Sequence, residues 1–181
     1  MAGVERRKNM IRTDERNIKS IAAMSNNDEY RYRLTRIWDE KKEIIGIIML
    51  NPSKANVIKT DKTIMNICNY LIDNEYGGVD VVNLFSYMTT DKKYLKNRNH
   101  EYEKYNDEYI TKVVNDRCMT IIAWGSNTGE YKNRKKDVEN LLIPYRNKLK
   151  CFRNENKKLV CHPLLLNNKW KLVDYPFFYI K

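Results

Sequence analysis

This sequence of 181 residues is poor in residues that interrupt regular structure or build metal sites. It has 6 glycines, 4 prolines, 4 cysteines and 2 histidines. No Gly/Ser/Pro-rich linker divides it, and its length suits one domain with a buried core. The cysteines form no Cys-x-x-Cys pair, which disfavours a zinc site and favours reduced thiols. We therefore expect a cytoplasmic protein with no metal ligands and no cofactor.

Long apolar segments are also missing. The longest apolar run, Ile44 to Leu50, is only seven residues and includes Gly46. A membrane-spanning helix needs roughly 20 such residues. The first sixteen residues are charged throughout, without the apolar stretch of a signal peptide. Neither a membrane partner nor an export signal is expected.

Positive charge is in excess. The formal net charge is +11, and the pI is about 9.4. The chain also holds 22 lysines and 22 asparagines, a pairing that AT-rich coding produces without any functional cause. The excess is nevertheless local, because residues 132–158 carry 10 basic and 3 acidic side chains. This local surplus favours an anionic partner: a nucleotide, a nucleobase-bearing ligand or a nucleic acid.

Short apolar segments alternate with amphipathic ones along the chain. This order is typical of a three-layer α/β sandwich. We expect a mainly parallel central sheet of four strands with one added N-terminal antiparallel strand. Residues 1–25 are expected to form an N-terminal helical arm, and residues 26–181 a single α/β domain. The expected strands are 29–38, 44–50, 79–85, 118–124 and 149–152, and the expected helices are 61–74, 91–116 and 131–147. A tight turn at 154–156 leads from the last strand to a further apolar segment, 159–166.

Polar or turn-forming residues follow the expected strands, where ligands of parallel sheets usually bind. We expect them to converge on one crevice. They are Asn51, Pro52 and Ser53, then Asn83 and Phe85, then Trp124 and Gly125, and finally His162.

Each of these residues also has a purely structural interpretation. Asn51 could start the Pro52 turn or hold a water molecule. Asn83 could cap its strand or hydrogen-bond a base edge, as carboxamides do. Asp61 could cap the helix that follows or activate water. His162 could be structural or an exposed imidazole that donates a proton or stabilises an anion.

Familiar catalytic motifs are not found: there is no G-x-G-x-x-G, no Walker A loop and no G-x-S-x-G elbow. Cys161 and His162 are adjacent, so on a strand they would point to opposite faces and could not act as a nucleophile–base pair. A covalent hydrolase is therefore disfavoured.

Five ordered motifs resemble the domain-of-unknown-function family 1643, over roughly residues 28–168. The family comprises bacterial and phage proteins without an established activity. The motifs are Tyr30-Arg31-Tyr32-Arg33-Leu34, Met49 to Asn56 with Asp61-Lys62-Thr63, Gly78 to Tyr87, Ala123-Trp124-Gly125, and His162-Pro163-Leu164-Leu165-Leu166.

The same motif order is also similar, more weakly, to the uracil-DNA glycosylase superfamily. That resemblance implies a uracil-DNA glycosylase-like fold in which Asn51-Pro52 positions a water, Asn83 reads the base and His162 stabilises the departing base. Leu164-Leu165 stands where the superfamily has a Ser-Pro pair in its DNA-intercalating loop. The stacking aromatic expected after the first motif is replaced by Ser53, Lys54 and Ala55.

Three hypotheses from different classes follow. The first is an enzyme that hydrolyses an N-glycosidic bond, with Asn51, Asp61 and His162 as catalytic residues. Lys132 and Arg134 of the basic segment would then bind phosphates. The second is a binding protein that sequesters a nucleotide or similar ligand in the same crevice without chemistry. The third is a basic α/β protein with a peptide or protein partner, whose lysines reflect genome composition.

Overall fold

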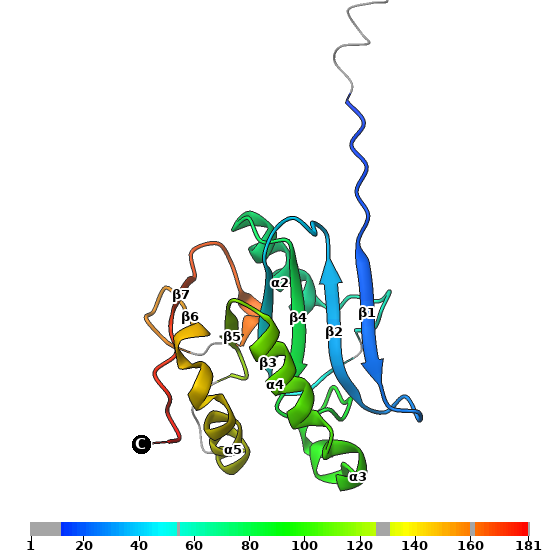
Figure 1. The fold of residues 1–181 in the computed structure, drawn as a ribbon, viewed down its shortest axis with the longest axis vertical. Helices are drawn as coiled ribbons and strands as arrows, with labels where there is room; N and C mark the ends of the chain where they lie inside the picture. The colour runs from blue at the N-terminus through cyan, green and yellow to red at the C-terminus, as the bar shows by residue number, and fades with distance from the viewer. Residues whose placement is uncertain (1–11, 54, 126–130, 160–161, 181) are drawn as a thin grey trace, which may run out of the picture.

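The computed structural model describes residues 12–53, 55–125, 131–159 and 162–180, which contain a seven-stranded mixed sheet (Figure 1). The sheet order is β1-β2-β4-β3-β5-β6-β7. The strands are β1 (Lys19–Met24), β2 (Arg31–Ile37), β3 (Ile44–Met49), β4 (Gly78–Asn83), β5 (Thr120–Ile122), β6 (Leu149–Arg153) and β7 (Lys171–Asp174). The α-helices are α2 (Lys62–Asp73), α3 (His100–Glu103), α4 (Asn106–Asp116) and α5 (Lys132–Leu142). Three 3-10 helices are η1 (Lys92–Asn97), η2 (Ile143–Lys148) and η3 (Pro163–Leu165).

Four neighbouring strands form the parallel centre of the sheet. β4, β3, β5 and β6 run in one direction, and β2 lies antiparallel against β4. This arrangement confirms the expected four parallel strands with an antiparallel strand beside them. Two further antiparallel strands, β1 and β7, extend the sheet beyond the expectation. The parallel strands end at one edge, which is the lower edge in Figure 1.

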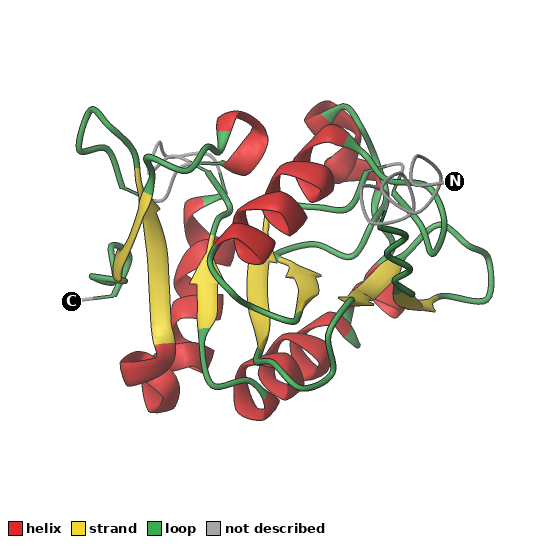
Figure 2. Cartoon of the chain, turned by 90° about the horizontal axis from the view of Figure 1, so that it is seen from above, coloured by secondary structure: helices red, strands yellow, loops and turns green. Residues whose placement is uncertain are grey.

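Helices cover both faces of the sheet (Figure 2). On one face, Ile64, Ile67 and Leu71 of α2 join Ile45 and Ile47 of β3 in a buried cluster. The opposite face is covered by α4 and α5, whose buried residues join Ile48 in a second cluster. The helix contributions to that second cluster are Ile110, Val113, Val114, Val138 and Leu142.

Part of the expected N-terminal helical arm is a strand, so the helical interpretation is wrong at Lys19–Met24. These residues form β1, which pairs antiparallel with β2. The spacing of Ile18, Ile21 and Met24 is compatible with a helix, but an unpaired edge of β2 offers backbone hydrogen-bond partners along its whole length. Residues 1–11 of the arm lie outside the described residues.

The apolar segment 159–166 is not one continuous strand, because Pro163–Leu165 form the 3-10 helix η3. Residues 160–161 of this segment lie outside the described residues. Proline lacks the backbone N–H that a sheet ladder needs. The place beside β6 is taken by β7, in antiparallel register from Lys150↔Asp174 to Arg153↔Lys171. The expected helix 91–116 is divided into η1, α3 and α4, and 131–147 into α5 and η2.

A buried carboxylate fixes β2 against the parallel strands. Asp80 of β4 is fully buried and accepts hydrogen bonds from Arg33 Nε and Thr35 Oγ1, both at 2.6 Å. Arg117, which follows α4, donates to it from Nε at 2.8 Å. Burial alone would raise the pKa of Asp80, but these hydrogen bonds outweigh it and lower the pKa below its ordinary value. The charge thus joins β2, β4 and the end of α4.

Replacing this carboxylate should destabilise the protein. We expect Asp80→Asn to lower the free energy of unfolding at pH 7 by about 2–4 kcal/mol, because two arginines lose their buried counter-charge. The stabilisation is complete above the unfolded-state pKa of Asp80 and is lost only as the pH falls through the lowered pKa. Urea unfolding measures the change. Asp73→Asn, an exposed substitution at the end of α2, is the control, and equal effects of the two variants would contradict the prediction.

Candidate functional site

A cavity of about 170 Å³ lies at the carboxyl edge of the parallel strands, on the α2 side. It is bounded by the start of β2, the end of β3, the start of α2, the segment before η1, and His162. The lining residues are Arg31, Met49, Leu50, Asn51, Ser53, Asp61, Thr63, Thr89, Thr90, Lys92 and His162.

Four residues predicted from separate segments therefore line one cavity: Asn51, Ser53, Asp61 and His162. Two more predicted residues adjoin it. Pro52 is buried, and its carbonyl accepts from Asn51 Nδ2 and from the Thr89 N–H, both at 3.0 Å. Gly125 has a φ of +91°, and a Cβ built there would lie 4.0 Å from the His162 Cβ. Glycine suits that left-handed backbone and leaves room beside the imidazole.

Asn51 is held by its own loop and by the segment before η1. Its Nδ2 donates to Thr89 O at 2.7 Å in addition to Pro52 O. Both amide protons are thus used, which leaves Oδ1 as the acceptor of this half-buried side chain. An acceptor fixed in this way can orient a water molecule or a ligand N–H.

Asp61 is the N-cap of α2, as one sequence interpretation proposed. Its Oδ1 accepts the Ile64 N–H at 2.9 Å, and its Oδ2 accepts the Ser53 hydroxyl at 2.6 Å. An ionised carboxylate has about four acceptor positions, so two hydrogen bonds do not saturate it. Capping and proton acceptance are compatible in this geometry.

His162 is exposed at the mouth of the cavity and caps η3. Its Nδ1 accepts the Leu164 N–H at 3.3 Å, so the neutral ring carries its proton on Nε2. Partial desolvation lowers the pKa of His162 below 6.5, Lys92 lowers it further, and Asp61 raises it. The imidazole is therefore neutral at pH 7, with Nε2–H as a donor.

Two cationic residues that line the cavity, Arg31 and Lys92, were not predicted from the sequence. Arg31 is almost fully buried and donates to Ala55 O, while its Nε has no hydrogen-bond partner among the described residues. Burial lowers the pKa of Arg31 to about 10, and Asp61 raises it, so the guanidinium stays charged at pH 7. Arg31 was not selected as a site residue, although the family motif Tyr30 to Leu34 contains it.

Asn83 and Trp124 do not line the cavity. Asn83 is buried beside Met49 in the parallel register, and neither its Oδ1 nor its Nδ2 has a partner among the described residues. Trp124 is buried edge-on against Tyr175, with rings 5.7 Å apart. Asn83 therefore lies on the strand next to Met49, which lines the cavity, but does not line the cavity itself. Trp124 belongs to the second core cluster.

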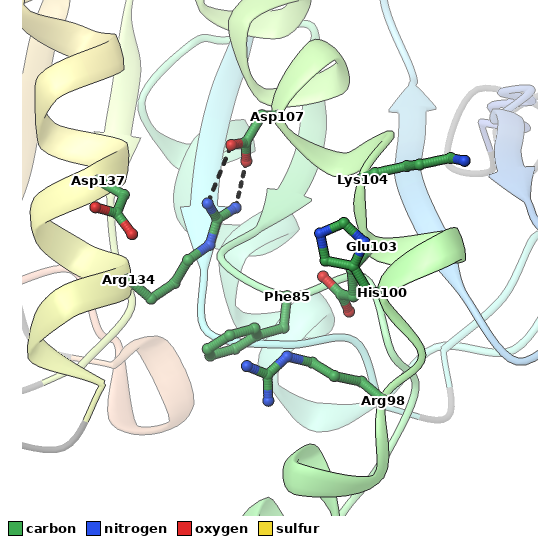
Figure 3. A pocket seen from close by; sticks show the side chains of 8 residues that line it. All are labelled: Phe85, Arg98, His100, Glu103, Lys104, Asp107, Arg134 and Asp137. Carbon is green, nitrogen blue, oxygen red and sulfur yellow. Dashed lines mark hydrogen bonds and ion pairs between the residues drawn. The ribbon is translucent and has the colours of Figure 1, made fainter.

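The remaining predicted residues, Phe85, Lys132 and Arg134, lie in a separate hollow on the α4–α5 side. Figure 3 shows Arg134 reaching towards Asp107, which it contacts with both terminal nitrogens, and Arg98 beside the Phe85 ring. Arg134 also donates to Leu84 O at 2.8 Å. Its charge is thus largely used within the fold.

Among the described residues, no group of three or more His, Cys, Asp or Glu side chains is placed to hold a metal ion. In the same part of the chain, the helices are too short or too polar to span a membrane.

The titration of His162 should report the charges around it. NMR titration of the ring should give a pKa below 6.5 in the unmodified protein. Lys92→Gln should raise this pKa, because a nearby positive charge is removed, and Asp61→Asn should lower it. Lys112→Gln, a substitution on α4 outside the cavity lining, is the control and should leave the pKa of His162 unchanged. Shifts of the opposite sign would show that the cavity charges are not arranged as described.

Comparison with known proteins adds one result to this geometry. None of the curated proteins matches the chain. The sequence pattern of a family described as "Protein of unknown function (DUF1643)" matches residues 31–164, which include every residue that lines the cavity. The chain therefore belongs to the DUF1643 family of proteins of unknown function.

Proposed function

We propose that this protein hydrolyses the N-glycosidic bond of a nucleotide or nucleic acid whose base occupies the cavity. The observation that supports this proposal most strongly is that Asn51 and Asp61, at the two ends of the loop between β3 and α2, line the same small cavity as His162, about 100 residues later in the chain. Together they supply an acceptor, a carboxylate and an N–H donor, the groups that this reaction requires.

In the proposed reaction, Asn51 Oδ1 and the Asp61 carboxylate hold a water molecule against the sugar C1′. The water oxygen forms a bond to C1′, and the bond from C1′ to the base nitrogen breaks. The bonding electrons leave with the base, Asp61 accepts the water proton, and His162 Nε2–H donates a hydrogen bond to the departing base. The Arg31 charge adds electrostatic stabilisation of that anion.

The cavity volume is in keeping with a base as occupant. At about 30 Å³ per molecule, 170 Å³ corresponds to roughly five or six water molecules. This is below the ~300–1,000 Å³ of sites for drug-sized ligands. A base ring would fill it, and the sugar and phosphate would lie outside, next to the exposed Lys92.

As part of this proposal, the sheet is organised as in the uracil-DNA glycosylase superfamily. Support comes from Asn51-Pro52 after β3, Asn83 at the end of β4, and His162-Pro163 opposite them. Asn51 and His162 line the same cavity, whereas Asn83 is buried beside Met49 of its wall.

Release of free base tests the proposed reaction. We expect Asp61→Asn to reduce base release from oligonucleotides or nucleotides by about a hundredfold or more. The variant should remain folded, because Asn caps helices nearly as well as Asp. Asn51→Ala and His162→Gln should give losses of similar direction with ligand affinity retained. His100→Gln, outside the cavity, is the matched control. Chromatography measures the base, and no release by the unmodified protein from a broad substrate panel would refute the proposal.

One observation favours a second function, a binding protein without chemistry. The Asp61 oxygens and the Asn51 amide protons already have intramolecular partners, so the cavity is preformed and needs no activated water. Such a protein would co-purify with an unmodified nucleotide detectable by mass spectrometry. If substitution of Asn51 and His162 leaves affinity intact and abolishes turnover, the hydrolase is correct.

A further inference from the structure

We infer that segment 92–98 is a docking surface for single-stranded nucleic acid and delivers a base of that strand to the cavity. This inference rests on the proposed function insofar as it treats the cavity as a base-binding site. It goes further in naming the substrate class, a polynucleotide strand and not a free nucleotide.

The first support is the position of the segment. Lys92, the first residue of η1, lines the cavity together with Thr89 and Thr90, which precede it in the chain. A strand bound along η1 would therefore pass the mouth of the cavity. Single strands expose their bases, so a base can enter without being extracted from a duplex.

The second support is charge. Lys92, Lys93 and Lys96 lie within five residues and are all exposed. Arg98 ends the segment with its guanidinium over the Phe85 ring and bonded to Leu95 O at 2.6 Å, so it is left out of this charge. The acidic residue of this stretch is Asp91, which caps η1 and pairs with Lys93 at 2.9 Å. That exposed ion pair contributes little and competes weakly with a phosphate. The surplus positive charge therefore faces solvent beside the cavity, where a polyanion can neutralise it.

The third support is an exposed aromatic ring among these cations. Tyr94 is 47% exposed, and the Lys93 ammonium lies 4.9 Å from its ring centroid. Exposed aromatic rings in positively charged grooves stack on the bases of single strands without regard to sequence. An acidic protein partner or an anionic lipid surface would use the lysines but would have no specific need for this flat ring.

The fourth support is rigidity. Leu95 is fully buried in the second core cluster, so the side chains on either side of it must face outwards. The backbone of the segment is held at both ends, by Tyr131 Oη to Lys92 O at 3.3 Å and by Asn99 N to Tyr30 Oη at 2.7 Å. A surface held in place loses little conformational entropy when a strand binds.

Fluorescence anisotropy with a labelled 20-residue oligothymidylate tests the inference, in the full chain and over a range of salt concentrations. The unmodified protein should bind, with affinity that falls steeply with salt. Lys93→Glu combined with Lys96→Glu should weaken binding at least tenfold and flatten the salt dependence. The control, Lys112→Glu combined with Lys171→Glu, makes the same charge change at exposed sites on α4 and β7 and should alter affinity less than twofold.

Tyr94 separates stacking from charge. Tyr94→Ala should weaken oligothymidylate binding about tenfold with an unchanged salt slope, and Tyr94→Phe should retain affinity. Several outcomes would overturn the inference: no binding of the oligonucleotide, equal effects of the two double variants, equal affinity of Tyr94→Ala and Tyr94→Phe, or binding to phosphatidylserine vesicles in place of the oligonucleotide.

Failure of this inference is distinguishable from failure of the proposed function. Oligothymidylate binding through segment 92–98 without base release from any substrate would support the docking surface and reject the hydrolase. Base release from free nucleotides without oligonucleotide binding would support the hydrolase and reject the docking surface.

Discussion

The buried charge of Asp80 determines where β2 lies, and the position of β2 determines the composition of the cavity. The bonds from Arg33 and Thr35 hold β2 against β4 in antiparallel register, from Leu34↔Val81 to Ile37↔Gly78. The start of β2 then lies at the edge where β3 and β4 end, and it brings Arg31 into the cavity wall. Without this antiparallel strand, that edge would lack its only deeply buried cation among the described lining residues.

The side chains proposed to act in the reaction also hold the cavity together. Asp61 begins α2 and holds Ser53, and Asn51 joins the β3 loop to Thr89. These bonds fix each group before any ligand arrives, which is the preorganisation that electrostatic catalysis and tight binding both need. Structural and functional interpretations of these residues are therefore not alternatives, and only removal of charge with the bond retained, as in Asp61→Asn, separates them.

The sequence predicts the centre of this fold well because its signals there are local. The apolar runs of β3, β4 and β5 and the helical spacing of α2 are decided by burial within each segment. Edge strands depend on which partner is available, so β1 and β7 were not foreseen. In the site, the sequence identified the loop residues that directly follow strands. It did not identify Arg31, because the burial of Arg31 results from β2 being covered on both faces.

The positive charge counted along the sequence also differs from the charge that is exposed in the fold. Segment 132–158 has the largest basic surplus in the sequence, yet three of its cations have partners in the described structure. Arg134 contacts Asp107, Lys150 contacts Asp174, and Lys148 donates to Asn115 O. Segment 92–98 carries fewer positive charges, but Lys92, Lys93 and Lys96 are exposed and Lys92 lines the cavity. A count along the sequence measures how much charge is present, whereas binding of an anion depends on the charge that remains exposed after folding. The proposed docking surface therefore uses the smaller of the two surpluses.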